Sequence, residues 1–346
     1  MSSNLSYEQT NVLTRLVEDK RSHFVVLGPA GCGKSFVRDK YLHLNPRALL
    51  LGTTGASISG TRNSFTVERF ICMKRKTFPL PATVIIEECS MLDATTLARL
   101  NRKLQMFGST QPFGGVQLIM FGDVLQLPPV PGRYFFTSEL FKRNDFSVLV
   151  LRENFRQQDV QLKAFCDKLR YGGDADLRIL LEYRRRPPLF TPTICATKSV
   201  AAEHNRRSLA KWKGADIKVG SKSWKIGVPL VVTENIYQHG QLVVANGTFG
   251  TLSKEGKFME PGKGVTAIDS KFLALNFAMT VHRAQGKTLK SVAIDGKGGM
   301  FAPHQLYVAV SRAQFSERLY INNVEPKDGA VPWLDDLNHF AKTYML

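Results

Sequence analysis

Short apolar runs alternate with amphipathic stretches along the first half of the chain. Four runs bounded by Gly, Pro or charged residues have the length of buried strands: Phe24–Leu27, Ala48–Leu51, Val84–Ile86 and Val116–Phe121. Between them, Ser35–Leu42 and Asp93–Met106 carry apolar residues at helical spacing. Strands that alternate with helices predict an α/β fold with a parallel sheet covered on both faces.

The second half repeats this pattern less regularly. Strands are expected at Val148–Leu151, Thr193–Ala196 and Val292–Ile294, and helices at Val160–Arg170 and Pro303–Ala313. Short β-type runs and Gly-rich turns fill the stretch near 218–271, where Asn246–Gly247 is a hairpin signal. The pattern therefore predicts two α/β domains, 1–145 and 146–346, with a small β insertion in the second.

Composition agrees with two domains and adds a charge excess. The 346 residues correspond to two domains at about 150 residues each. The chain has 47 Lys and Arg against 29 Asp and Glu, a net charge of +18. Because such an excess repels itself, a polyanionic partner is the simplest explanation, nucleic acid first and an anionic membrane second. A charge surplus that serves solubility alone is the remaining alternative.

The location expected for the chain is intracellular and reducing, away from membranes. Apolar runs such as Val148–Leu151 are far too short to span a bilayer. The five cysteines (32, 72, 89, 166 and 195) are scattered and form no CxxC pair, which argues against a disulfide framework and a zinc ribbon. The seven histidines show no metal-ligand spacing such as HExxH.

A phosphate-binding motif follows the first predicted strand. Gly28–Ser35 reads GPAGCGKS and matches G-x-x-x-x-G-K-[ST], between an apolar strand and a helical pattern. The loop residues Gly28, Pro29, Ala30, Gly31, Cys32 and Gly33 would turn backbone N–H groups toward phosphate oxygens. Lys34 would reach the β- and γ-phosphates, and the Ser35 hydroxyl would ligate Mg²⁺. The motif thus predicts ATP and Mg²⁺ as cofactors.

Acidic and polar residues follow two further predicted strands. Glu87 and Glu88 end the run Val84–Ile86, where Glu87 is a candidate for the metal shell and Glu88 for orienting the attacking water. Asp123 and Gln126 follow the third strand, where a polar side chain can sense the γ-phosphate. Simple loop chemistry remains open for this last pair.

Several blocks in order together resemble the PIF-type (petite integration frequency) DNA helicases, of the 5′-to-3′ branch of helicase superfamily one. They are YEQ (7–9), TTGASISG (53–60), IIEECSML (85–92), PFGGVQLIMFGDVLQLPPV (112–130), ENFRQ (153–157), MTVHRAQGKTL (279–289) and YVAVSRA (307–313). The resemblance covers nearly the whole chain. It implies two RecA-like lobes in tandem, with a small β (SH3-like) insertion in the second.

The resemblance also assigns roles around the nucleotide. Gln9 would contact adenine, Gln126 would sense the γ-phosphate, and Gly286 would join the nucleotide-binding residues. Arg156 and Arg312 would be arginine fingers from the second lobe, which couple hydrolysis to lobe movement when the lobes close.

Strand contacts are implied in both lobes. The matching positions are Thr54, Gly55, Ser64 and Phe65 in the first lobe and Thr280, His282 and Gln285 in the second. Hydroxyl and small residues would contact phosphates, and an aromatic or His would stack on a base. Three basic clusters, Lys74–Lys76, Arg184–Arg186 and Arg206–Lys213, are either solvated faces or further backbone contacts.

The expected function is therefore an ATP-dependent DNA helicase that translocates 5′ to 3′ on single-stranded DNA and unwinds forked duplex DNA. The resemblance implies roles in DNA replication, repair and recombination, and a monomer or weakly self-associating protein. Two alternatives stay open: a nucleotide-switched ATPase that grips single strands without robust unwinding, and a viral-type RNA helicase with RNA as its partner.

The chain departs from the family pattern at several positions. The family's Asp-Glu pair reads Glu87-Glu88, its HSF reads Asn63-Ser-Phe, and its HKSQG reads HRAQG. The connection from Thr251 to Phe272 is short for the family's β insertion. We expect Mg²⁺ binding to be retained with Glu87, and the other two swaps keep hydrogen-bonding or cationic character. The short insertion predicts minimal elements for separating and gripping DNA strands, so ATP hydrolysis is a firmer expectation than unaided unwinding.

Overall fold

The chain forms two compact units in the computed structural model. The structure describes residues 4–58, 61, 64–74, 79–157, 159–171, 179–238, 241–300, 302, 304–325 and 335–345. Unit 1 comprises residues 1–158 and 332–346, and unit 2 comprises residues 159–331. The chain therefore enters unit 2 once and returns to unit 1 at its C-terminal end.

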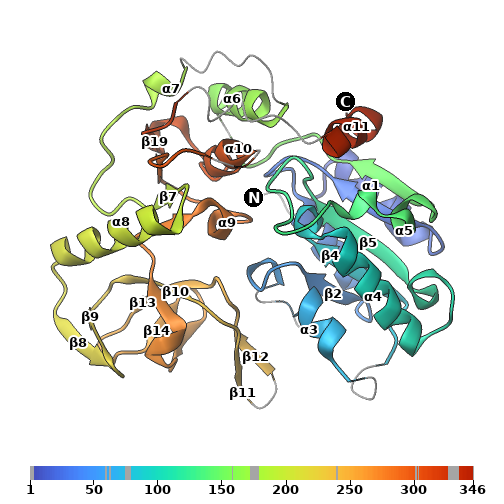
Figure 1. Cartoon of the computed structure of the whole chain (residues 1–346), viewed down its shortest axis with the longest axis horizontal. Coiled ribbons are helices and arrows are strands. Elements are labelled where there is room, and N and C mark those ends of the chain that lie inside the picture. Colours follow the sequence, from blue (N-terminus) through green and yellow to red (C-terminus); the bar gives the residue numbers. More distant parts are fainter. Residues whose placement is uncertain are drawn as a thin grey trace. The chain divides into compact units, whose positions relative to one another are not determined.

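Unit 1 is built on a six-stranded parallel sheet in the order β3-β2-β4-β5-β1-β6, of which β2, β4 and β5 are labelled in Figure 1. Its strands are β1 (His23–Leu27), β2 (Leu49–Gly52), β3 (Ser64–Thr66), β4 (Thr83–Glu87), β5 (Gln117–Gly122) and β6 (Phe146–Val150). The strands expected at the four apolar runs of the first half are confirmed as β1, β2, β4 and β5. Their carboxyl ends meet at one edge of the sheet, where ligands bind in open α/β sheets.

Alternate residues of these strands fill two separate cores, one on each face of the sheet. Val25 and Leu27 pack on one face with residues of α3 and α4, whereas Phe24 and Val26 pack on the other with residues of α1 and α2. The helices of unit 1 are α1 (Tyr7–Glu18), α2 (Lys34–Leu44), α3 (Val67–Cys72), α4 (Ala94–Phe107), α5 (Glu139–Lys142) and α11 (Asp335–Tyr344). Burial on both faces explains why the strands read as continuous apolar runs.

The C-terminal helix α11 belongs to unit 1 although it follows unit 2 in the sequence. Its Phe340 stacks on Phe136 with ring centroids 4.2 Å apart, and Leu337 and Ala341 are buried in the same core. Asp336 accepts a hydrogen bond from Arg133 at 3.0 Å. Helix α11 thus completes one face of unit 1.

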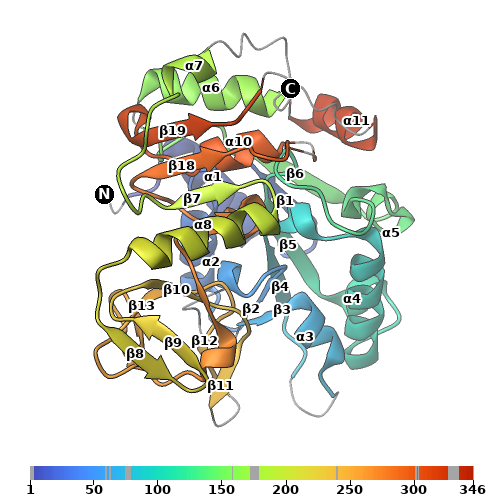
Figure 2. The ribbon, with the colours of Figure 1, turned by 60° about the vertical axis from the view of Figure 1, so that its left-hand side comes forward.

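Unit 2 contains a smaller parallel sheet in the order β17-β7-β18-β19, with β7, β18 and β19 side by side in Figure 2. Its strands are β7 (Thr193–Cys195), β17 (Ala278–Thr280), β18 (Val292–Asp295) and β19 (Leu319–Asn322). The helices of this part of unit 2 are α6 (Val160–Tyr171), α7 (Ile179–Glu182), α8 (Lys198–Lys211), α9 (Val281–Ala284) and α10 (Gln305–Val310). The two parallel-sheet units confirm the α/β fold class with two RecA-like domains.

An antiparallel region lies between α8 and β17. It has a five-stranded sheet in the order β15-β14-β13-β10-β16 and the hairpins β8-β9 and β11-β12. Its strands are β8 (Asp216–Val219), β9 (Lys222–Lys225), β10 (Pro229–Val232), β11 (Ile236–Gln238), β12 (Gln241–Val244), β13 (Phe249–Leu252), β14 (Phe258–Glu260), β15 (Gly264–Thr266) and β16 (Leu273–Leu275). Its separate core includes Trp224, Leu230 and Phe258. The insertion therefore spans slightly more than the expected 218–271.

The prediction of a β-hairpin at Asn246–Gly247 is wrong. The turn joins β12 to β13, which belong to different sheets, because β12 pairs with β11 and β13 pairs with β10 and β14. The Gly247 N–H instead donates to the Val232 carbonyl at 2.8 Å, which fixes the turn on β10. Gly247 has φ 81°, so the Asn-Gly signal marked a left-handed turn correctly.

The division between the units falls later than residue 145. Strand β6, expected to open the second domain, pairs in parallel with β1 from His23↔Phe146 to Leu27↔Val150. The sequence shows an apolar run but not which sheet receives it. Among the residues that the structure describes, no helix is long and apolar enough to cross a membrane.

Candidate nucleotide-binding site

The loop between β1 and α2 has the backbone that its glycines require. Gly31 and Gly33 have φ values of 92° and 80°, in the region that favours glycine. At Gly28, an added Cβ would lie 2.5 Å from both the Leu151 carbonyl oxygen and the Cys32 sulfur. The loop ends at the N-terminus of α2, where free N–H groups and the helix dipole favour an anion.

Lys34 and Ser35 begin α2 and point in different directions. The Lys34 ammonium donates to the carbonyl oxygens of Gly28 and Pro29 at 2.8 and 2.9 Å, so it folds back over the loop. The Ser35 hydroxyl donates to Glu87 Oε1 at 2.7 Å. The phosphate loop is thereby joined to the end of β4.

Glu87 is a buried carboxyl held by two partners. Arg38 Nη1 lies 3.0 Å from Oε1, the same oxygen that accepts from Ser35. Burial raises the pKa of Glu87 to about 7, and the repulsion of Glu88 adds to this, whereas Arg38, Ser35 and Lys34 oppose it. Burial is therefore the largest influence on the pKa of this carboxyl, ahead of its two partners.

The other oxygen of Glu87 fits a metal shell. Oε2 is buried without a hydrogen-bond partner among the described residues, and a buried acceptor left this way is costly unless something else satisfies it. An oxygen from Glu87 beside the Ser35 hydroxyl matches the oxygen ligands that Mg²⁺ prefers. The two residues expected to hold Mg²⁺ thus lie together, and their chemistry suits it.

Glu88 follows in a strained backbone conformation. Its φ of 58° lies in the left-handed region that non-glycine residues rarely adopt. The Thr53 hydroxyl donates to the Glu88 carbonyl at 3.0 Å, and the Thr53 N–H donates to the Glu87 carbonyl at 3.3 Å. These bonds hold the strained turn, and such strain is concentrated at functional sites.

Asp123 and Gln126 lie beyond the end of β5, which is next to β1. Asp123 is fully buried, and its carboxylate accepts from the Leu125 N–H and from Gln126 Nε2, both at 3.3 Å. Gln126 Oε1 is buried without a hydrogen-bond partner in the described part of the chain. The Gly28 N–H donates to the Gly122 carbonyl at 3.3 Å, which ties this turn to the phosphate loop.

Gln9 lies on the phosphate loop itself. Its Nε2 donates to the Cys32 carbonyl at 3.2 Å, and its Oε1 accepts from the Ser6 N–H at 3.1 Å in the N-terminal cap of α1. The side chain is buried against Gly33, where an added Cβ would lie 2.3 Å from Nε2. The family resemblance at YEQ (7–9) therefore identified a residue that contacts the phosphate loop.

The segment 153–157 covers the other side of the loop. The Phe155 N–H donates to the Gly31 carbonyl at 2.9 Å, and Asn154 Nδ2 donates to the Ala30 carbonyl at 3.2 Å. Arg156 was expected to come from the second lobe, but it belongs to unit 1. It lies so close to Gly31 that a Cβ added to this glycine would be 2.4 Å from the Arg156 Cβ. Arg156 is thus beside the phosphate loop within one unit.

The residues of unit 1 that are expected to contact the DNA strand lie near β2 and β3. Thr54 accepts at Oγ1 from the Ser57 N–H, and Gly55 is buried beside it. Ser64 is buried, with its hydroxyl donating to the carbonyls of Thr61 and Ile58 at 2.7 and 3.3 Å. Phe65 is partly buried against the core. Asn63 lies outside the described residues.

The second-lobe candidates lie together around α9. Thr280 ends β17 as the N-cap of α9, His282 is half-buried on that helix, and Gln285 and Gly286 follow it, Gly286 with φ 76°. Burial lowers the pKa of His282, and the nearby Lys198 lowers it further, which favours the neutral imidazole.

Arg312 is fully buried within unit 2. Its guanidinium donates to the carbonyls of Val308 and Lys287 at 2.9 and 3.3 Å and to the Ser311 hydroxyl at 2.7 Å. The Leu289 N–H donates to the Arg312 carbonyl at 2.9 Å. Arg312 therefore ties the segment 279–289 to α10.

Two residues of this site were missed by sequence reasoning. Arg38 lies four residues after Lys34, on the same face of α2, a spacing that could have placed it near the loop. Asn154 belongs to the motif ENFRQ (153–157), but no role was predicted for its side chain. Its side chain binds the loop at Ala30 and accepts from the Arg156 N–H at 2.9 Å.

A parallel sheet with a glycine-rich phosphate loop after its first strand, and a buried carboxylate bonded to the loop serine, defines a P-loop nucleoside triphosphatase. The AAA domain family matches residues 4–186. The ATP-dependent DNA helicase PIF1 of Homo sapiens is 25% identical over 93% of this chain and 61% of its own length. The chain thus spans less than two thirds of this relative. It belongs to the AAA domain family and is similar to the PIF1 helicases.

Solved structures agree on the fold. A structure of two coordinating Pif1 helicases, concerned with DNA unwinding at forked double-stranded DNA, matches 99% of this chain and 97% of its own. The identity is 22% and the TM-score 0.84. Pif1 helicase from Bacteroides in complex with ADP-AlF3 and single-stranded DNA matches 99% of both chains, with 22% identity and a TM-score of 0.76.

Proposed function

We propose that this protein is an ATP-dependent DNA helicase that translocates 5′ to 3′ on single-stranded DNA and unwinds the duplex ahead. The observation that carries the proposal is the phosphate loop whose Ser35 is hydrogen-bonded to the buried Glu87, in a chain similar to the PIF1 helicases. Complexes of a Pif1 relative with ADP-AlF3 and single-stranded DNA support it.

The residues of unit 1 have complementary roles in hydrolysis. The loop N–H groups and Lys34 bind the phosphates, after Lys34 exchanges its carbonyl partners for phosphate oxygens. Ser35 and Glu87 would hold Mg²⁺, which supplies positive charge beside the phosphates when bound. Glu88 orients the attacking water, Gln126 senses the γ-phosphate through its unpartnered oxygen, and Gln9 contacts adenine.

Two arginines complete the charge stabilisation. Arg156 lies beside Gly31 of the phosphate loop, and its guanidinium would bind a phosphate from there. Arg312 has its guanidinium bonded inside unit 2, so its role as a finger requires some of those bonds to be exchanged. Gly286 is the proposed nucleotide-binding residue of unit 2. It precedes Lys287, whose carbonyl accepts from Arg312.

The strand would contact residues of both units. Thr54, Gly55 and Phe65 in unit 1 and Thr280, His282 and Gln285 in unit 2 are the proposed contacts, with Ser64 supporting the first group from its buried position. The partners are single-stranded and forked duplex DNA, of which the latter is named for a relative.

Forked duplexes with a tail on one strand only test the proposal. Unwinding of the substrate with a 5′ tail, and not of the substrate with a 3′ tail, is expected in the presence of ATP and Mg²⁺. Preference for the 3′ tail would contradict the polarity. ATP hydrolysis stimulated equally by RNA would favour an RNA helicase.

A nucleotide-switched binding protein is the second candidate. Glu87 is one methylene longer than the Asp that the family has at this position, and Arg38 contacts its carboxylate. The connection from Thr251 to Phe272 is also short for the family's β insertion. Both features favour this candidate. Hydrolysis stimulated by single-stranded DNA, with no separation of either forked substrate, is the result that would select this candidate.

A further inference from the structure

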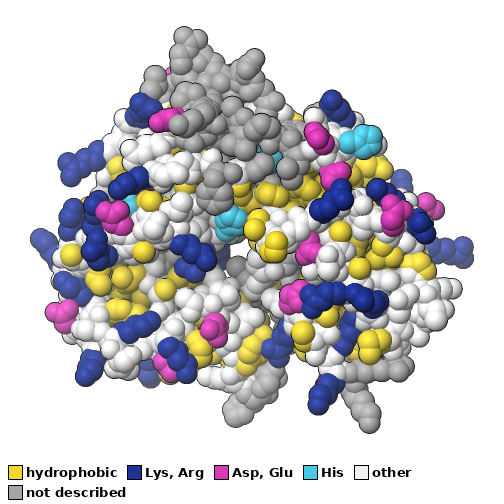
Figure 3. Space-filling model, viewed as in Figure 1, with side chains coloured by type: hydrophobic (Ala, Val, Ile, Leu, Met, Phe, Trp, Pro, Cys, Tyr) yellow, Lys and Arg dark blue, Asp and Glu magenta, His cyan; other side chains and the backbone are white. Residues whose placement is uncertain are grey.

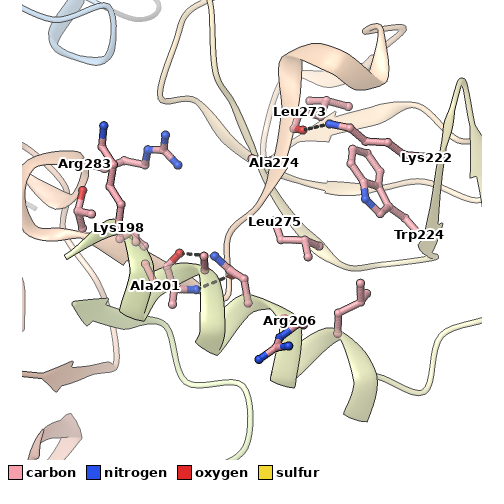
Figure 4. A pocket seen from close by; sticks show the side chains of 15 residues that line it. Lys198, Ala201, Arg206, Lys222, Trp224, Leu273, Ala274, Leu275 and Arg283 are labelled. Atoms are coloured by element: carbon pink, nitrogen blue, oxygen red, sulfur yellow. Dashed lines mark hydrogen bonds between the residues drawn. The ribbon is translucent and has the colours of Figure 1, made fainter. Parts of the chain in front are cut away.

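A pocket of about 550 Å³ lies within unit 2, outside the phosphate loop. It is bounded by α8 on one side and by β9, β16, β17 and α9 on the others (Figure 4). Thr280 and Arg283 belong to the segment 279–289, whereas Lys198, Arg206 and Lys222 lie outside the motifs that resemble the helicase family. The pocket volume lies in the range of small-ligand sites.

The wall of this pocket carries positive charge without any negative charge. Lys198 and Arg206 on α8, Lys222 on β9 and Arg283 on α9 line it, and none of the fifteen lining residues is acidic. None of these four cations forms an ion pair with a described residue. The acidic residue of α8, Glu203, bonds instead to Arg207 and Lys297.

The same face of unit 2 is basic as a whole. Figure 3 shows dark blue Lys and Arg side chains gathered on the side where Figure 1 draws α8, with only scattered acidic side chains among them. An uncompensated cluster of cations around a hollow attracts an anion and concentrates it there.

Apolar groups form the floor of the pocket, and hydrogen bonds fix it. Asn205 Nδ2 donates to the Ala278 carbonyl and Oδ1 accepts from the Ala278 N–H, both at 2.9 Å, so α8 is clamped to β17. Lys222 Nζ donates to the carbonyls of Ser270 and Leu273 at 2.8 and 3.0 Å, 5.3 Å from the Trp224 ring centroid. A lysine has three donors, so one remains for a ligand.

We propose that this pocket binds a nucleotide unit of single-stranded DNA, beyond the motif contacts. The proposal rests on the helicase function above. Cations at opposite sides suit consecutive phosphates, and the apolar floor between them suits a sugar or base. Thr280, a proposed contact of the DNA strand, lines the pocket, so the pocket adjoins the proposed path of the DNA strand.

The test compares two charge changes on one helix. Lys198→Gln with Arg206→Gln removes two pocket cations that are exposed on α8. Arg207→Gln is the matched control, because it removes a neighbouring cation that pairs with Glu203 outside the pocket. Binding of a labelled oligodeoxythymidylate is measured by fluorescence anisotropy across a salt series.

The double variant is expected to bind about 25-fold more weakly at 0.1 M salt, with a salt slope about 1.4 smaller, because each phosphate contact on a single strand contributes about 0.7 to that slope. Arg207→Gln is expected to shift affinity much less. Equal losses in the control and the double variant would overturn the pocket assignment.

Two further outcomes separate this inference from the proposed function. A wild-type protein that fails to bind the oligonucleotide contradicts the helicase proposal itself. A pocket for free mononucleotides would bind dTMP in the wild type and lose it in the double variant while strand affinity stayed constant, which would overturn strand binding here.

Discussion

At the scale of single residues, the unusual feature is a buried glutamate that shares one oxygen with a serine and an arginine. Removing a carboxylate from water is costly, and Arg38 at 3.0 Å and Ser35 at 2.7 Å offset only part of that cost. The pKa of Glu87 is consequently raised to about 7. Between pH 4.5 and about pH 7, the folded protein therefore keeps the Glu87 carboxyl protonated, whereas the unfolded chain would release this proton.

This raised pKa makes stability depend on pH in a particular direction. Between the ordinary value of 4.5 and about 7, the unfolded chain releases the Glu87 proton and the folded chain retains it. The free energy of unfolding then falls as pH rises, by on the order of 3 kcal/mol in total. Above about pH 7 this loss is complete.

Glu87→Gln should abolish this contribution. We expect its free energy of unfolding, relative to the wild type, to be higher at pH 8 than at pH 5, by on the order of 3 kcal/mol. Urea denaturation without nucleotide and with a chelator measures it. Glu139→Gln, at an exposed side chain on α5, is the control, and an equal difference at both pH values for Glu87→Gln would contradict the pKa.

Lys34→Ala should abolish ATP turnover and leave DNA binding measurable. Its ammonium is the cation that folds over the loop, and no other loop side chain can replace a point charge on the β- and γ-phosphates. Lys40→Ala, on the same helix, is expected to retain turnover. Normal hydrolysis in Lys34→Ala would remove the phosphate site from this loop.

Residue types could be predicted where a motif fixed them, and less well where a contact depended on packing. Lys34, Ser35 and Glu87 lie together as their spacing and strand context implied. The contact of Arg38 with Glu87 needed the structure, because the two side chains meet only when α2 lies against β4. For Arg156, the motif identified the residue as a candidate, but only the structure showed that it belongs to unit 1 and not to unit 2.

At the scale of elements, the segment 153–157 fixes the phosphate loop from outside. Asn154 donates to Ala30 and accepts from the N–H groups of Arg156 and Gln157 at 2.9 and 3.3 Å. One side chain thereby links the loop to the segment that carries a proposed arginine finger. Backbone groups on both sides depend on it.

Asn154→Ala should destabilise the protein by about 1–3 kcal/mol, because it leaves donors and an acceptor without their partner. Nucleotide affinity should fall with it, since Ala30 and Gly31 lose a support. Denaturation and an ADP titration measure the two effects. Asn45→Ala, whose Nδ2 donates to Tyr41 at the end of α2, should leave ADP affinity unchanged, and equal behaviour of both variants would contradict the role of Asn154.

Elements with strong periodicity were predictable, and those defined by pairing were not. β1, β2, β4 and β5 read as apolar runs because both faces of their sheet are buried. β6 has the same pattern, but only its ladder with β1 assigns it to unit 1. Helix α8 was not recognised because few of its residues are buried, so its sequence lacks an apolar stripe.

At the scale of the whole molecule, unit 1 is assembled from two distant parts of the sequence. Phe340 of α11 is buried between Phe136 and Phe141, with ring centroids 4.2 and 6.2 Å away. No local pattern could predict this, because the contact spans about two hundred residues of chain. The core of unit 1 is thus incomplete until the rest of the chain has been made.

Phe340→Ala should destabilise unit 1 by about 3–5 kcal/mol, as for other buried aromatic side chains that leave a cavity. The exposed Lys342→Ala on the same helix should change stability by no more than about 0.5 kcal/mol. Chemical denaturation followed by a probe in unit 1 measures both. A loss below about 1 kcal/mol for Phe340→Ala would mean that α11 contributes little to this core.

The return of the chain to unit 1 has a mechanical consequence. Unit 2 is inserted into unit 1 and is linked to it at both ends. After a cut in the first connection, unit 2 would remain covalently joined only to α11, whose packing in the core of unit 1 would be non-covalent. Tension applied between residues 4 and 345 would be borne by unit 1 until α11 peels away from Phe136, and only then would it reach unit 2. A probe attached next to α11 would therefore report on unit 1, although the pocket of unit 2 lies closer in the sequence.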